Sequence, residues 1–96
     1  MSNAAAVTET LRLLTRTECG LCEDMWTQLQ ALRARHPLPP LELVDVDSDA
    51  TLQRRYGLRI PVLLLGNTLV CEQRLDEGEL LRQLRVSAAA HRPIPP

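Results

Sequence analysis

Apolar and polar positions at the start of the chain predict a short strand followed by a helix. Residues 11–15 (LRLLT) are apolar and are followed by polar residues, which indicates a buried strand. From Cys19 to about Arg35, apolar residues recur at spacings of three and four, as on one face of an amphipathic helix: Cys22, Met25, Trp26, Leu29 and Leu32. Thr17 is the predicted N-cap, and His36-Pro37 is the predicted end of this helix.

A second strand and a short helix are predicted next. Residues 41–46 (LELVDV) alternate in polarity as a half-buried strand does. The helix after them takes Ser48 or Asp47 as its N-cap and Gly57 as its C-terminal stop.

The second half of the chain predicts a β-hairpin and a final helix. After Pro61, two apolar segments flank the dipeptide Gly66-Asn67, which can take the positive φ of a tight turn. Asp76 followed three residues later by Glu79 resembles a capping box that opens a helix.

The predicted order of elements is β-α-β-α-β-β-α. A β-α-β unit requires parallel strands, whereas a tight Gly-Asn turn makes the last two strands antiparallel. The sequence therefore predicts an α/β domain, a small four-stranded mixed sheet with helices on both faces. We assign residues 11–90 to this domain, residues 1–10 to a flexible N-terminus and residues 91–96 to a Pro-rich tail.

Composition and charge exclude several classes of function. The formal net charge is −1, and all 11 basic residues are Arg, so Schiff-base lysine chemistry and a phosphate-loop lysine are excluded. The only aromatic residues are Trp26 and Tyr56, which leaves little for base stacking. We expect no nucleic-acid partner, no membrane partner and a monomer. The opening MSNAAAVTET has neither a basic start nor an apolar stretch as long as that of a signal peptide, so we expect a cytoplasmic protein.

Cys19 and Cys22 form a CxxC motif where the first strand gives way to the first helix. A redox pair, half of a metal site and two inert thiols are three alternatives. A zinc site needs about four ligands, and beyond the motif only Cys71, His36 and His91 are candidates. For a redox pair, the helix N-terminus stabilises a thiolate, so Cys19 would be the nucleophile and Cys22 the resolving thiol. Cys71, in the middle of a predicted strand, is expected to be buried and inert.

Two motifs carry a resemblance to a known family. CGLC at residues 19–22 opens a helix after a strand, and RIPVL at residues 59–63 opens the hairpin. This arrangement resembles the thioredoxin fold and, more closely, the small glutaredoxin-like proteins, over residues 11–85. The resemblance implies a thiol-disulfide oxidoreductase whose substrate is a protein disulfide or a glutathione mixed disulfide.

The resemblance also implies roles for individual residues. Pro61 would be a cis proline facing the CxxC motif, and the backbone of Ile60 would pair with the bound substrate. Arg16 matches a basic residue of glutaredoxins and would contact an acidic group of the substrate. Gly20 and Leu21, which replace a typical Pro-Tyr pair, would border the same groove, and Asp76 matches an acidic position that caps the last helix.

No bound cofactor is implied beyond the redox-active disulfide Cys19–Cys22. Glutathione is a candidate reductant, although the chain has CEQRLDEGEL where glutaredoxins usually carry a Gly-Gly that helps bind it. The alternatives to an enzyme are a non-catalytic binding module and a domain that binds or delivers a metal through its CxxC thiols.

Overall fold

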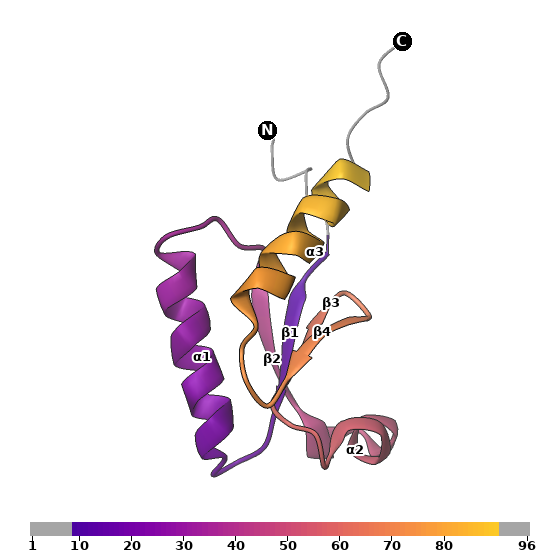
Figure 1. The fold of residues 1–96 in the computed structure, drawn as a ribbon. Coiled ribbons are helices and arrows are strands. Elements are labelled where there is room, and N and C mark those ends of the chain that lie inside the picture. Colours follow the sequence, from indigo (N-terminus) through magenta and orange to yellow (C-terminus); the bar gives the residue numbers. More distant parts are fainter. Residues whose placement is uncertain (1–8, 91–96) are drawn as a thin grey trace.

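A four-stranded sheet in the order β2-β1-β3-β4 forms the centre of the protein (Figure 1). The computed structural model describes residues 9–90, with side chains through Ala88; the predicted tail with His91 and most of the predicted flexible N-terminus lie outside these residues. The elements are β1 (Leu11–Thr15), α1 (Gly20–Arg33), β2 (Leu41–Asp45), the 3-10 turn η2 (Val46–Ser48), α2 (Ala50–Tyr56), β3 (Val62–Leu65), β4 (Thr68–Glu72) and α3 (Glu77–Ala90).

The pairing of the strands confirms the predicted mixed sheet. β1 runs parallel to β2 and antiparallel to β3, and β3 pairs with β4 in a hairpin. Gly66 in the hairpin turn has a φ of +61°, the left-handed conformation that glycine adopts at little cost. A register shift between Leu63 and Leu64 interrupts the β3–β4 pairing. Because of these pairings, the last residue of β2 and the first residue of β3 lie at the edge of the sheet where β1 ends.

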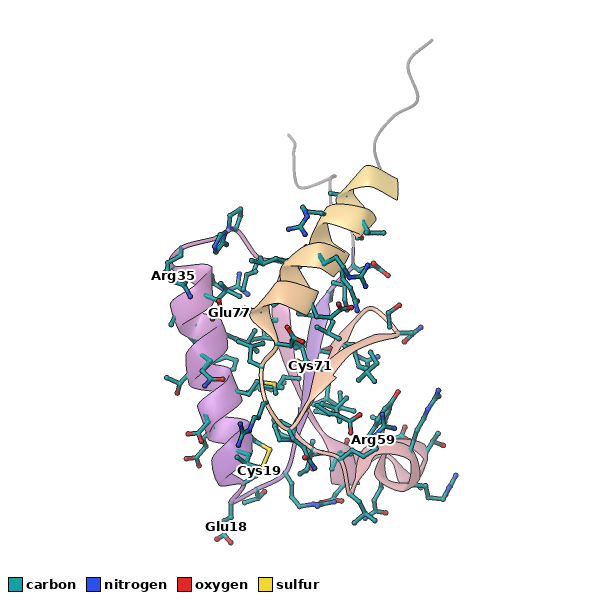
Figure 2. The ribbon with its side chains drawn as sticks, viewed as in Figure 1. Glu18, Cys19, Arg35, Arg59, Cys71 and Glu77 are labelled. Carbon is teal, nitrogen blue, oxygen red and sulfur yellow. A yellow bond between two sulfur atoms is a disulfide. The ribbon has the colours of Figure 1, made fainter. Side chains whose placement is uncertain are left out.

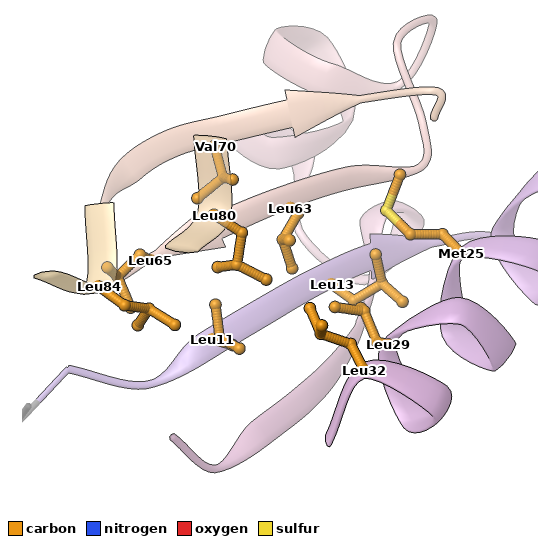
Figure 3. Close-up of a cluster of buried hydrophobic side chains, with 10 residues drawn as sticks. All are labelled: Leu11, Leu13, Met25, Leu29, Leu32, Leu63, Leu65, Val70, Leu80 and Leu84. Carbon is orange, nitrogen blue, oxygen red and sulfur yellow. The ribbon is translucent and has the colours of Figure 1, made fainter. Parts of the chain in front are cut away.

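Helices cover both faces of the sheet, as the sequence predicts. α1 and α3 pack on one face around the main core cluster (Figure 3), which consists of Leu11, Leu13, Met25, Leu29, Leu32, Leu63, Leu65, Val70, Leu80 and Leu84. η2 and α2 pack on the other face around the smaller core cluster, which consists of Leu14, Val46, Tyr56, Val62 and Leu64. Neighbouring residues of one strand, such as Leu13 and Leu14, belong to different clusters because successive side chains of a strand point to opposite faces of the sheet.

The first helix begins and ends at residues that differ from the prediction. Its N-cap is Cys19 rather than Thr17, because the Cys19 sulfur accepts the backbone N–H of Cys22. It ends at Arg33 rather than at His36-Pro37. The Arg33 guanidinium donates to the backbone oxygens of Leu38 and Pro39 and so holds the segment that leads to β2. Within residues 9–90 no helix is long and apolar enough to span a membrane.

The caps of the later helices also differ in detail. α2 is capped by Asp49, whose carboxylate accepts the N–H groups of Thr51 and Leu52, and not by Ser48 or Asp47. Asp76 caps α3 as predicted, accepting the N–H of Glu79 at 3.0 Å. The Glu79 carboxylate instead accepts from Arg82 and Gln83, so it does not form the reciprocal half of a capping box.

Candidate active site

A disulfide joins Cys19 and Cys22 at the start of α1 (Figure 2). The sulfur of Cys19 accepts the N–H of Cys22 at 3.2 Å, and the carbonyl of Cys19 accepts the N–H of Glu23 at 3.1 Å. Cys22 is buried, with 4% exposure, whereas Cys19 is half-buried. A disulfide takes up two electrons when it is reduced to two thiols, so this site is capable of redox chemistry, and Cys19 is the more exposed of its two cysteines.

The segment that leads from β1 to the disulfide makes a sharp turn at Glu18. Glu18 has a φ of +59°, a left-handed conformation that costs a residue other than glycine roughly 1–2 kcal/mol. Its side chain points away from the rest of the protein (Figure 2). The turn redirects the chain from the edge of the sheet into α1 and places Cys19 at the helix N-terminus.

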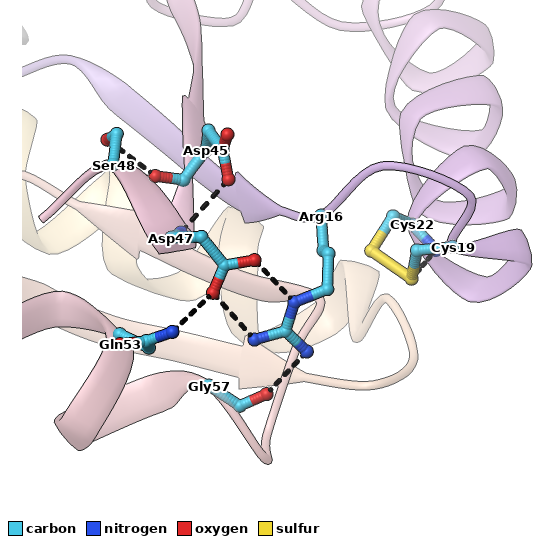
Figure 4. A network of polar contacts seen from close by, with 8 residues as sticks. All are labelled: Arg16, Cys19, Cys22, Asp45, Asp47, Ser48, Gln53 and Gly57. Carbon is cyan, nitrogen blue, oxygen red and sulfur yellow. Dashed lines mark hydrogen bonds and ion pairs between the residues drawn. A yellow bond between two sulfur atoms is a disulfide. The ribbon is translucent and has the colours of Figure 1, made fainter. Parts of the chain in front are cut away.

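Arg16 lies beside the disulfide, but its guanidinium binds elsewhere. It donates to both carboxylate oxygens of Asp47, at 2.7 and 3.0 Å, and to the backbone oxygen of Gly57 at 3.1 Å. Figure 4 shows the side chain reaching toward these groups rather than toward the sulfurs. The hydrogen bond from Arg16 lowers the pKa of Asp47, and Gln53 supports this shift with a second hydrogen bond. The positive charge of Arg16 is therefore matched by a carboxylate.

A pocket of about 210 Å³ opens beside the disulfide, and we call it the Trp26 pocket. Its lining residues are Thr15, Arg16, Cys19, Cys22, Glu23, Trp26 and Leu43. Trp26, which the sequence places on the buried face of the helix, is 37% exposed. It lies roughly 90° around the helix from the middle of the buried face, and its ring forms a wall of the pocket instead of part of the core.

Other candidate residues lie outside this pocket. Leu21 is exposed and lines a second hollow of about 370 Å³, together with Asp24, Met25, Gln28, Gln73, Arg74 and Leu75. Gly20 is exposed, and a Cβ added there would meet nothing within 4 Å. Asp76 is engaged as the cap of α3.

Ile60 and Pro61 lie next to the end of β1. Leu14 of β1 pairs with Val62, so Pro61, one residue earlier, comes beside the carboxyl end of β1 where the turn to the disulfide begins. The Ile60–Pro61 peptide bond is cis, the isomer that the resemblance implies. Pro61 is buried, and its carbonyl accepts the N–H of Gln73 at 2.7 Å.

Within the described residues, neither Cys71 nor His36 extends the site into a metal centre. Cys71 is half-buried rather than fully buried as predicted, and it packs against the main core cluster. Burial raises the pKa of its thiol, which disfavours the reactive thiolate. Among the residues that the structure describes, no group of three or more His, Cys, Asp or Glu side chains is placed to hold a metal ion.

Three residues of the site were missed by sequence reasoning. Trp26 follows Cys22 by four residues, a spacing that puts two helical side chains side by side, so its place next to the motif was readable from the sequence. Leu43 reaches the pocket from β2, and Asp47 meets Arg16 across 31 residues of chain. Only the tertiary fold brings Leu43 to the pocket and Asp47 to Arg16.

Comparisons with known proteins agree with this geometry. Residues 10–85 match a family model described as Glutaredoxin-like domain (DUF836). A protein from Nitrosomonas europaea, solved by NMR, is 30% identical with a TM-score of 0.70, over 78% of this chain and 89% of that one. A protein from X. campestris is 33% identical with a TM-score of 0.57, over 79% and 96% of the two chains.

A more distant structure shows the same fold. The oxidised form of mitochondrial thioredoxin 3 from Saccharomyces cerevisiae is 18% identical with a TM-score of 0.55, over 86% of this chain and 82% of that one. Among curated proteins, no significant sequence match is found.

Proposed function

This chain belongs to the glutaredoxin-like family of thioredoxin-fold proteins, and we propose that it is a thiol-disulfide oxidoreductase. In this proposal Cys19 is the nucleophile and Cys22 the resolving thiol. The observation that carries it is the Cys19–Cys22 disulfide at the N-terminus of α1, with the first cysteine half-buried and the second buried.

The first step is attack by the reduced protein on a substrate disulfide. The Cys19 thiolate forms a bond to one substrate sulfur, the substrate S–S bond breaks, and the other substrate sulfur leaves as a thiolate that takes up a proton. The N–H groups of the first turn of α1, which have no partner of their own within the helix, and the helix dipole favour the thiolate at Cys19. The N–H of Cys22, which contacts the Cys19 sulfur in the disulfide, is one of these groups.

The second step releases the product. The Cys22 thiolate attacks the Cys19 sulfur, the mixed disulfide breaks, and the second substrate thiol leaves. Two electrons have then passed from the protein dithiol to the substrate disulfide. The dithiol is regenerated when one external thiol attacks the Cys19–Cys22 disulfide to form a mixed disulfide and a second thiol attacks that mixed disulfide, so that the two external thiols leave joined as a disulfide. We include glutathione as one candidate for that reductant.

An equilibrium titration in glutathione redox buffers tests the proposal. We expect a Cys19–Cys22 disulfide that forms reversibly at a poise between about −270 and −180 mV, the range from thioredoxin to disulfide isomerase, read by intact mass and peptide mapping. Cys19→Ser is expected to abolish turnover, and Cys22→Ser to stop at the mixed disulfide. Cys71→Ser is the matched control and should titrate as the wild type does.

A different result would overturn the proposal. If Cys19 and Cys22 both stay free across the range, or only products of Cys71 appear, the dithiol mechanism is wrong. A binding module that keeps its partner affinity after Cys19→Ser would then account better for the fold.

A further inference from the structure

The single tryptophan of the chain lies at the surface beside the disulfide. Of the two aromatic residues, Tyr56 is buried in the smaller core cluster at 7% exposure, whereas Trp26 is 37% exposed. Leu43 of β2, 54% exposed, lines the Trp26 pocket with it. Covering the exposed apolar surface of these two side chains with another apolar group removes it from water, which is favourable.

The size of the Trp26 pocket limits what it can hold. Its volume of about 210 Å³ is below the roughly 300–1,000 Å³ of clefts that enclose a whole small-molecule ligand. Both cysteines of the disulfide belong to its lining. A side chain next to the reacting cysteine of a substrate can therefore enter this pocket while the sulfur of that cysteine meets Cys19.

The charges around the disulfide favour a basic or neutral substrate. Glu23 and Arg16 are the ionisable groups that line the Trp26 pocket, apart from the cysteines, and the charge of Arg16 is matched by Asp47. Glu23 is exposed, and no ion pair within residues 9–90 involves it. Arg74 lines the separate hollow beside Leu21 rather than this pocket. Glu23 therefore gives the pocket an uncompensated negative charge.

We propose that the Trp26 pocket is a specificity site for polypeptide disulfides that carry an apolar side chain, and beside it a basic one, next to the reacting cysteine. This inference rests on the proposed oxidoreductase function and names its substrate class. The apolar side chain packs between Trp26 and Leu43, and the basic side chain meets Glu23. Glutathione offers no large apolar side chain, and its two carboxylates against one ammonium give it a net negative charge that Glu23 repels.

Single-turnover rates with matched disulfides test the inference. The reduced protein is mixed with bis(2-hydroxyethyl) disulfide, glutathione disulfide, and two symmetric peptide disulfides, one with Leu and Arg flanking each Cys and one with Gly and Glu. Acid-quenched samples are analysed by mass spectrometry. We expect the Leu/Arg peptide to react at least tenfold faster than either the Gly/Glu peptide or glutathione disulfide, with a smaller gap in 1 M salt, where charges are screened within about 3 Å.

Variants assign this preference to the pocket. Trp26→Ala and Leu43→Ser are each expected to lower the ratio of the two peptide rates about tenfold, as loss of much of one buried apolar contact predicts. Glu23→Gln should lower the preference for the basic peptide and remove its salt dependence. Val86→Ala changes another exposed apolar residue, 57% exposed on α3, and should keep the wild-type ratio.

The results separate this inference from the proposed function. Equal rates with both peptides, while bis(2-hydroxyethyl) disulfide still reacts, overturn the specificity site and leave the oxidoreductase intact. Failure to react with any disulfide overturns both. If Trp26→Ala does not fold, the test rests on Leu43→Ser, which lies on the edge strand, and on Glu23→Gln. A ratio of the two peptide rates that stays at the wild-type value in both variants contradicts the inference.

Discussion

Reduction of the Cys19–Cys22 disulfide is expected to lower the free energy of unfolding by about 2 kcal/mol. The bond joins residues three apart in sequence and so closes a loop of four residues. In the chain-entropy model, such a loop removes freedom from the unfolded chain worth about 2 kcal/mol, against about 3 kcal/mol for a loop of 15 residues. The main core cluster contains neither cysteine, so reduction leaves its packing in place.

Urea unfolding followed by far-UV circular dichroism measures this difference. In thermal unfolding of a domain of this size, the same loss of about 2 kcal/mol corresponds to a fall in Tm of roughly 8–16 °C. The slope of free energy against urea should stay the same, because nearly the same surface is exposed on unfolding. The double variant Cys19→Ser/Cys22→Ser should have the unfolding free energy of the reduced protein, and added reductant should not change it. Cys71→Ser should lose unfolding free energy on reduction as the wild type does.

Two outcomes would contradict the expected loss of about 2 kcal/mol. A loss above about 4 kcal/mol, or loss of cooperative unfolding, would make the disulfide a structural staple, as in small secreted domains. No measurable loss would mean that the four-residue loop constrains the unfolded chain less than the chain-entropy model requires.

Three further predictions concern the cap of α3, acid stability and the third cysteine. Asp76→Ala should cost about 1 kcal/mol of unfolding free energy and Asp76→Asn much less, since asparagine also caps helices; equal losses in the two variants would contradict the capping role. Hydrogen bonds from arginines lower the pKa of Asp47 and bring that of Glu79 to about 2. A depressed folded-state pKa contributes stability above the unfolded-state value that is lost as pH falls, so the urea midpoint should drop between about pH 4 and pH 2, whereas a flat profile there would refute this. Burial raises the pKa of Cys71, so at pH 8.5 iodoacetamide should modify it several-fold more slowly in the folded protein than in urea; equal rates would show that the thiol is not shielded.

Local patterns in the sequence are sufficient to predict most of the fold. The strand at residues 11–15 has the same bounds in the structure, and the Gly66-Asn67 turn joins the two strands of the hairpin as expected. These features depend on neighbours in sequence: an apolar run bounded by polar residues and a dipeptide suited to a tight turn. The parallel pairing of the first two strands follows from the helix between them.

The sequence-based predictions fail where contacts between residues distant in sequence decide the role of a side chain. The run DVDSDA offers three carboxylates as caps, and the sequence does not show that Asp47 is taken by Arg16 while Asp49 caps α2. Trp26 has the spacing of a core residue, yet it lies at the flank of the buried face and lines the pocket. The two cysteines of the site were predictable because their chemistry depends on a spacing of three, whereas Leu43 reaches them only through the fold.

The unequal size of the two core clusters has a consequence for local unfolding. α2 and η2 are held by the smaller core cluster and by the Arg16–Asp47–Gly57 contacts, while α1 and α3 share the larger cluster. Segments with fewer buried contacts open at lower free energy than the core. Amide hydrogens of α2 are therefore expected to exchange before those of β1 and α1, and each such opening frees the guanidinium beside the disulfide. The Cys19–Cys22 site is then expected to alternate between a major form with a neutralised arginine and a minor form with a free cation.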